Sequence, residues 1–395
     1  MLNTNPISRF EEPSTPMSKT SSPSRPAGGT NRSPGISWTD LMKTDARPVP
    51  EFLTQESYTY RGSEPIAANR YTSLEFQELE NKKMWSNVRQ FAAREEDMPE
   101  SGDYIVSLQK DGSVRAFHNV CLHRGGKLRT ADGKADQFQC PFHGFTWKND
   151  GSFKRIPCRW DFPNLKDENL RLPEAKVCRW GGYIFVRENA EGPMLEEFLT
   201  PLPQHFERWR HDQCSTVIWV AKVIPANWKA TMEAFMEAWH TVVTHPQLLP
   251  FTGDENGAYW TWDDNVNVNL VPFGIMSPHV DPRGREEQWI VDEFIKFNGR
   301  SAENYDESQD AFAVKVPPGK PMPRGVPMKL LRTDQLWTDA PELGVLGAVF
   351  EQDMANLPYV QDGLKLSKTG EVNLSDYQEI RIRQFHQTLD KYLEN

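Results

Sequence analysis

Two short motifs near the middle of the chain carry residues that bind metals. The first reads Cys121-Leu-His123 and the second reads Cys140-Pro-Phe-His143, so each offers one thiol and one imidazole. Zinc fingers usually pair Cys with Cys and His with His along the chain. The alternation found here instead suits a [2Fe-2S] cluster in which two cysteines hold one iron and two histidines hold the other. The motifs therefore favour an iron–sulfur cluster over zinc.

A second set of candidate metal ligands lies about a hundred residues further on. The spacing of apolar residues predicts one amphipathic helix over 228–244, in which Glu237 and His240, three residues apart, share a face. His240 and His245 are five residues apart, so an ideal helix would splay them by roughly 140°. Because a residue before proline is pushed out of the helical region, Pro246 should loosen the helix at His245 and let its imidazole turn back.

Two imidazoles and a carboxylate form the facial triad that holds non-haem Fe(II) and leaves coordination positions open. The best candidate for the carboxylate is Asp353, which follows the apolar run 343–350, interpreted as a core strand. Glu351 and Asp362 are the alternatives. The competing interpretation is that the two histidines only pack in the core or lie at the surface.

The elements around these motifs predict four regions. Residues 1–50 are rich in Ser, Thr, Pro and Gly, so we expect disorder there. Residues 51–102 predict a helical lead-in that packs on the region after residue 190, with a helix over 71–85. Residues 103–190 predict a small antiparallel β-domain, because short β-rich runs at 104–108, 114–118 and 183–187 alternate with turn signals at Asp111-Gly112 and Asp150-Gly151. The metal-binding motifs should lie on loops of this domain.

Residues 191–395 read as an α+β region that carries the second metal site. We expect helical structure at 193–212, a strand at 216–224 and strands within 253–275. The charged, Pro-rich stretch 298–325 predicts a mobile excursion, and apolar spacing over 375–395 predicts a closing helix.

Composition excludes several classes of function. The net charge of -10 and pI near 5.5 argue against nucleic acid or an anionic membrane as a partner. No run of about 18 apolar residues is present, and the N-terminus lacks a secretory signal, so we expect a cytoplasmic protein that does not span a membrane. The chain has five cysteines, a small and odd number, so we do not expect a disulfide framework.

Taken together, these features resemble the catalytic α subunit of the Rieske non-haem iron aromatic-ring-hydroxylating oxygenases over roughly residues 65–390. The resemblance rests on both metal-binding motifs and on four further segments: Gly144-Phe-Thr-Trp147, Asn227-Trp228-Lys229, Glu237-x2-His240-x4-His245 and Phe350-Glu-Gln-Asp353. It implies an α+β fold, with an N-terminal Rieske [2Fe-2S] antiparallel β-domain (103–190) followed by a helix-grip, START-like catalytic domain (191–395). It also implies homotrimers, with or without β subunits.

The resemblance assigns roles to individual residues. The cluster ligands would be Cys121, Cys140, His123 and His143. The Fe(II) ligands would be His240, His245 and Asp353. Glu237 would bridge His240 to a cluster histidine of the adjacent subunit and so carry electrons between the metals. Many members of the family have Asp where this chain has Glu237, and a glutamate is found among oxygenases that attack quaternary amines.

The function implied is that of a terminal oxygenase. It would take electrons from NAD(P)H through a separate flavin reductase, with or without a ferredoxin, because no G-x-G-x-x-G nucleotide fingerprint occurs here. O2 and an aromatic or other hydrophobic small molecule would be its substrates, held in a pocket predicted to contain Phe235, Met236, Val243, Leu346 and Phe350. Alternatives are N- or O-dealkylation, oxidation of a quaternary amine, a cluster-only electron carrier and a zinc-stapled binding protein.

Overall fold

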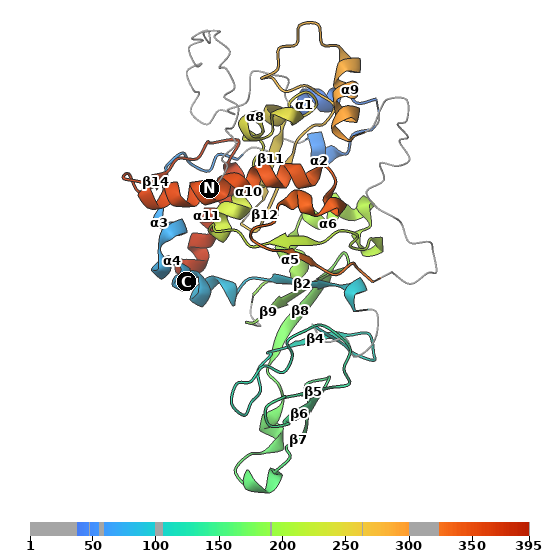
Figure 1. Cartoon of the computed structure of the whole chain (residues 1–395), viewed down its shortest axis with the longest axis vertical. Helices are drawn as coiled ribbons and strands as arrows, with labels where there is room; N and C mark the ends of the chain where they lie inside the picture. The colour runs from blue at the N-terminus through green and yellow to red at the C-terminus, as the bar shows by residue number, and fades with distance from the viewer. Residues whose placement is uncertain are drawn as a thin grey trace, which may run out of the picture.

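The computed structural model describes residues 38–46, 48–54, 59–98, 106–189, 192–262, 264–299 and 324–394. Figure 1 shows two parts along the long axis of the molecule, with short strands at one end and most of the helices at the other. The predicted order, an antiparallel β-domain followed by a mixed α+β region, is confirmed.

The first part contains two antiparallel sheets. One has five strands in the order β2-β9-β8-β4-β3, and the other has three in the order β5-β6-β7. The strands are β2 (Gln90–Arg94), β3 (Ser107–Leu108), β4 (Val114–Phe117), β5 (Gln137–Gln139), β6 (Thr146–Lys148), β7 (Phe153–Arg155), β8 (Glu174–Trp180) and β9 (Tyr183–Arg187). The turns predicted at Gly112 and Gly151 join β3 to β4 and β6 to β7, and both glycines have the positive φ that such turns favour.

The core of the three-stranded sheet fixes the loops that carry the metal-binding motifs. Trp147 on β6 is completely buried, and its indole N–H donates to the carbonyl of Leu170 at 2.5 Å. Cys121 and Cys140 are buried in the same apolar cluster as Trp147 and Phe138. The two motifs are therefore part of a packed core, which restricts their motion.

The second part is built around two long helices, α10 (Leu346–Leu366) and α11 (Ile380–Glu394). Along α11 the buried residues include Ile382, His386, Leu389 and Leu393, which is helical spacing for one inward face. The shorter helices are α5 (Leu195–Leu199), α6 (Leu202–Phe206), α7 (Trp228–Glu233), α8 (Thr241–Thr244) and α9 (Glu287–Phe297). Paired strands complete this part: β1 (Ile66–Ala67) with β14 (Glu371–Val372), β10 (Val220–Lys222) with β13 (Lys329–Leu331), and β11 (Ala258–Trp262) with β12 (Val266–Leu270).

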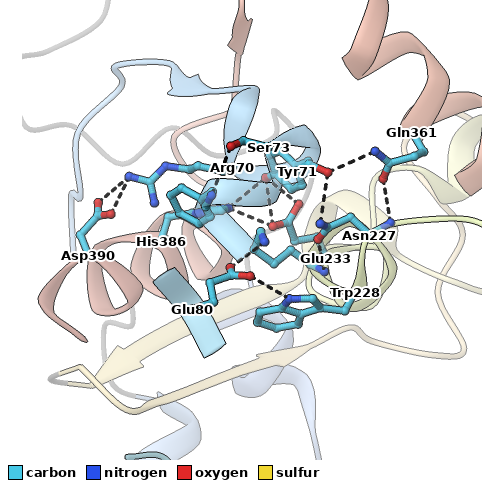
Figure 2. A network of polar contacts seen from close by, with 12 residues as sticks. Arg70, Tyr71, Ser73, Glu80, Asn227, Trp228, Glu233, Gln361, His386 and Asp390 are labelled. Atoms are coloured by element: carbon cyan, nitrogen blue, oxygen red, sulfur yellow. Dashed lines mark hydrogen bonds and ion pairs between the residues drawn. The ribbon is translucent and has the colours of Figure 1, made fainter. Parts of the chain in front are cut away.

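Within the predicted lead-in, the residues before β2 pack on the second part. It forms α3 (Asn69–Thr72), α4 (Leu74–Glu80) and a π-helical turn at Asn81–Trp85, and the Ser73 hydroxyl caps α4 by accepting from the N–H of Phe76. Glu80 on α4 and Lys229 on α7 form an ion pair of 2.6 Å with both side chains fully buried. Figure 2 shows the Tyr71 hydroxyl, which contacts the Glu233 carboxylate and the His386 ring, with Glu80 in the same network.

Three expectations about the chain are corrected. Part of the segment predicted to be disordered forms α1 (Trp38–Thr44) and, just beyond it, α2 (Glu51–Thr54), because Trp38 packs edge-on against Trp260 and its indole N–H donates to the carbonyl of Leu53. Residues 1–37 lie outside the described residues. Strand β2 lies within residues 51–102, where we expect a helical lead-in, but it belongs to the five-stranded sheet. The strand expected at 216–224 is reduced to β10.

Two more expectations fall partly or wholly outside the described residues. The strand predicted at 104–108 appears as β3 from Ser107, and residues 104–105 are not described. Most of the Pro-rich stretch 298–325 is likewise not described. Among the described helices, none has both the length and the apolar character needed to cross a bilayer.

Candidate metal centres

The two cysteine-containing motifs form loops with the same backbone geometry, which we call hook 1 (121–126) and hook 2 (140–145). In hook 1 the Cys121 N–H donates to the carbonyl of residue 126, and the N–H of Gly125 donates back to the Cys121 carbonyl. Hook 2 repeats both bonds at Cys140 and Gly144, at 2.8 and 3.0 Å. Gly125 and Gly144 have φ of 75° and 76°, a conformation that glycine adopts without strain.

The side chains of the hooks converge. The rings of His123 and His143 lie 4.6 Å apart between centroids, and the Cys121 and Cys140 thiols are within hydrogen-bonding range of each other. Burial raises the pKa of the Cys121 thiol, while the backbone N–H of His123 favours its thiolate. His123 also stacks on Phe145, with 4.8 Å between ring centroids. Two thiols and two imidazoles thus face one another from matched loops.

A second convergence involves His240, His245 and Asp353. Each offers one ligand atom, and these atoms all lie within 4.8 Å of one another. Asp353 Oδ1 is 2.8 Å from His245 Nε2 and 3.6 Å from His240 Nε2. His245 and Asp353 are buried, so the carboxylate and imidazole face each other away from bulk water. Burial alone would lower the pKa of His245, but hydrogen bonds to Asp353 and Gln352 outweigh it and raise the pKa.

The outer nitrogen of each imidazole is also held. Glu237 Oε1 lies 2.5 Å from His240 Nδ1, and its other oxygen accepts the backbone N–H of His240. Gln352 Oε1 lies 2.8 Å from His245 Nδ1. These contacts orient both rings so that the Nε2 atoms point toward Asp353. The contact of Gln352 with His245 was not predicted from the sequence. The position of Gln352 directly before Asp353, a predicted ligand, is the sequence feature that could have indicated it.

The helix that carries the histidines is interrupted, contrary to the prediction of one helix over 228–244. Helix α7 ends at Glu233, and α8 begins only at Thr241. Arg381 on α11 donates to the carbonyls of Phe235 and Met236, which a continuous helix would need for its own bonds. Burial lowers the pKa of Arg381 to about 10, so it remains protonated at neutral pH. Glu237 therefore meets His240 through the break and not along a helical face.

The expected effect of Pro246 is confirmed. Helix α8 ends before His245, whose φ of -126° and ψ of 55° lie outside the helical region. Asp353, by contrast, does not follow a strand. The apolar run before it enters α10, and Asp353 is a buried residue within that helix. Of the alternative acids, Glu351 accepts the backbone N–H of Trp337 and Asp362 pairs with Lys365 at the surface, so neither meets the histidines.

A cleft of about 640 Å³ borders His240 and Asp353 on the side of Glu237. Its described lining includes Tyr359, which is largely exposed, and none of the five residues predicted to line a substrate pocket. Met236 is corrected, because it is buried and lines a different cavity with Phe385 and Leu389. The break in the helix turns its side chain away from the histidines.

The other four predicted pocket residues are not enclosed by described residues. Phe235, Val243 and Leu346 are exposed, and the ring of Phe350 lies 6.2 Å from that of Phe235. An apolar surface is therefore available beside the histidines. It is not a closed cavity within the described part of the chain.

Both constellations fit the groups that the sequence suggested. Two buried thiols and two imidazoles match the donors of a Rieske [2Fe-2S] cluster, and the hooks would hold it. Two imidazoles with fixed tautomers and one carboxylate match the donors of a mononuclear Fe(II).

Comparisons with known proteins agree with both assignments. Residues 78–166 match the family model described as Rieske [2Fe-2S] domain, and residues 204–318 match the ring hydroxylating alpha subunit (catalytic domain). The glycine betaine monooxygenase oxygenase subunit of Pseudomonas aeruginosa is 26% identical over 228 residues, which is 54% of this chain and 51% of that protein. The large oxygenase component of the naphthalene 1,2-dioxygenase system of Pseudomonas putida is 33% identical over 40% of this chain and 39% of that protein.

Solved structures share the fold over most of the chain. A quaternary ammonium Rieske monooxygenase in complex with γ-butyrobetaine has a TM-score of 0.58 at 20% identity, covering 84% of this chain and 96% of that one. Naphthalene 1,2-dioxygenase from Rhodococcus sp. has a TM-score of 0.53 at 21% identity, covering 83% and 94%. The matched segments span about half the length, or less, of the curated relatives. This chain therefore combines a Rieske [2Fe-2S] domain with the catalytic domain of a ring hydroxylating alpha subunit, and it shares the fold of Rieske oxygenases.

Proposed function

We propose that this chain is the terminal component of an oxygenase that uses O2 and electrons from a NAD(P)H-dependent reductase to hydroxylate an aromatic or other hydrophobic small molecule. The observation that carries the proposal is the convergence of His240, His245 and Asp353 within 4.8 Å, in a chain that also forms two matched Cys/His hooks. A carrier with only the cluster would have no use for the second set of ligands.

Separate sets of residues would hold the cluster and the mononuclear iron. Cys121, Cys140, His123 and His143 would hold the cluster, and His240, His245 and Asp353 would hold Fe(II). The cluster would supply single electrons, and the iron would bind and activate O2. Gln352 and Glu237 would keep the two iron-binding rings in one tautomer and one orientation.

Glu237 is also proposed as the bridge between metals of adjacent subunits. Its carboxylate contacts His240 and lines a cleft that is open to solvent, so a side chain from a second copy could reach it. The cleft rim carries exposed Tyr359 and Val360, and hook 2 carries exposed Phe142 next to His143. These apolar surfaces support a homotrimer in which His143 of one subunit approaches Glu237 of the next.

A second candidate function is oxidation of a quaternary or tertiary amine. The specific observation is the aromatic group formed by Phe235, Phe350 and Trp337, with ring centroids 6.2 and 5.6 Å apart. Aromatic faces attract quaternary ammonium groups. Two of the relatives described above act on such compounds by name, one on glycine betaine and the other complexed with γ-butyrobetaine.

Metal analysis with visible spectroscopy tests the main proposal. The purified protein should contain about three irons and two labile sulfides per chain and show an iron–sulfur spectrum. Asp353→Asn should lose about one iron and keep the cluster spectrum, whereas Cys140→Ser should lose the spectrum. Two irons in both wild type and Asp353→Asn would indicate an electron carrier, and zinc without sulfide would rule out an oxygenase.

Substrate class is tested by oxygen consumption with a reductase and a set of paired compounds. A fused-ring aromatic hydrocarbon and a trimethylammonium compound of similar size should be compared, with product and H2O2 both measured. Product from the hydrocarbon supports the first candidate. Product from the ammonium compound alone supports the second and contradicts the first.

A further inference from the structure

The charge of the chain is distributed unevenly along the sequence, with a basic segment that follows β2 and carries both hooks. Residues 106–189 contain fifteen Lys and Arg and nine Asp and Glu, a formal charge of +6, although the whole chain carries -10. The rest of the chain therefore carries -16. Such a basic part on an acidic protein creates a local positive field that attracts acidic macromolecules.

A groove of about 750 Å³ lies on this basic part and reaches hook 2. Its described lining includes Cys140 and Gly144 of the hook, together with the basic residues Arg129 and Lys154. Asp136 is the acidic residue in the same lining. Phe142 and His143 are not among the described lining residues, so the groove approaches hook 2 from the side of Cys140.

Hydrogen bonds position the basic residues of the groove. Lys154 donates to the side-chain oxygen of Gln137 at 2.6 Å. The backbone of Arg129 is fixed by Asn119, whose side chain accepts the N–H of Arg129 and donates to its carbonyl. A second hollow of about 400 Å³ shares Arg129 and adds Lys127 and His118, with Asp132 as its acid. The groove thus continues into a wider basic surface.

We propose that this groove is the docking site of an acidic electron-transfer protein, which delivers electrons to the cluster from the Cys140 side. The inference rests on the proposed function. One electron would pass from the reduced donor to the oxidised cluster, with no bond made or broken. The occupant is a donor and not a second copy of this chain, because the proposed function assigns the second copy to the exposed Phe142 and His143, which do not line the groove. Electrons would then enter beside Cys140 and leave through His143.

Electron-transfer proteins form transient complexes with small interfaces, and the rates at which they associate depend on charge. The test uses a reduced acidic [2Fe-2S] ferredoxin as the probe and follows cluster reduction by stopped-flow absorbance over a range of ionic strengths. In Arg129→Gln/Lys154→Gln the second-order rate constant should fall about 10-fold at low salt and lose most of its salt dependence. Binding of the ferredoxin, measured by calorimetry, should weaken in parallel.

Two controls separate docking from damage. Lys296→Gln removes one exposed charge on α9, at the end of the molecule opposite β5, β6 and β7 (Figure 1), and should leave the rate unchanged. Dithionite, a small reductant that needs no docking site, should reduce the cluster of every variant at the wild-type rate. The single variant Lys154→Glu provides the same test if the double variant does not fold.

The outcomes distinguish the two proposals. A wild-type salt dependence in a variant with an intact cluster spectrum would overturn the docking site and leave the oxygenase proposal standing. An unchanged ferredoxin rate with an altered sedimentation mass would assign the groove to a second copy of the chain and also overturn it. Wild-type protein without any iron–sulfur spectrum would overturn both.

Discussion

The buried ion pair between Glu80 and Lys229 gives the sharpest prediction about stability. Both side chains are fully buried, and Lys229 Nζ lies 2.6 Å from Glu80 Oε1. Glu80→Gln would remove the hydrogen-bonded counter-ion of the ammonium group and leave it only the more distant field of Glu233, and breaking a buried pair in this way costs about 3–5 kcal/mol. Burial already lowers the pKa of Lys229, with Glu80 opposing that shift. The aromatic rings around Lys229 offset only about 1 kcal/mol of the loss.

The expected net loss is therefore about 3 kcal/mol. For a folding unit of 150–250 residues this corresponds to a fall in melting temperature of about 6–12 °C, measured by differential scanning calorimetry. Iron content should fall as well, because α7 carries Lys229 and ends four residues before Glu237. The matched control is Glu168→Gln, which breaks an exposed pair with Lys166 and should cost less than about 0.5 kcal/mol.

A double variant distinguishes pairing from packing. Replacing both partners, Glu80→Met/Lys229→Met, removes both charges and should recover much of the lost stability. A Glu80→Gln variant that melts within about 2 °C of wild type would refute the reasoning. So would a double variant that is less stable than Glu80→Gln.

Three other predictions concern the metal sites and a buried acid. Glu237→Gln should keep the cluster spectrum and all iron but stop turnover, and normal product formation would remove the bridging role. Gln352→Leu should weaken retention of the mononuclear iron by about 10- to 100-fold in a chelator competition, because His245 loses the partner that fixes its tautomer; an unchanged iron affinity would contradict this. Asp254 is completely buried, and burial raises its pKa above 3.8. A raised carboxyl pKa stabilises the folded state below pH 3.8 and loses that contribution as pH rises through the folded-state value. Asp254→Asn should therefore raise the melting temperature more at pH 7 than at pH 4, and an equal effect at both would argue against the raised pKa.

The sequence alone determined the features that depend on local chemistry. The spacing of Cys121, His123, Cys140 and His143 indicated the cluster, because ligand type and short loop length are properties of neighbouring residues. Pro246 predicted that the backbone would leave the helical region at His245, because the clash with proline acts on the preceding residue. Turn signals located the hairpins of the β-domain because the conformation of a tight turn also depends on adjacent residues.

Tertiary structure decided what depends on partners distant in the chain. Apolar periodicity predicted a continuous helix through Phe235, and only Arg381, some 145 residues later, withdraws the carbonyls that such a helix needs. Gln352 stands next to the predicted ligand Asp353 in the sequence, but its contact with His245 arises only when α10 packs beside that residue. The ordered segment at Trp38 likewise depends on Trp260. Local residue types predict which chemistry is available, whereas long-range hydrogen bonds and packing fix the geometry in which it occurs.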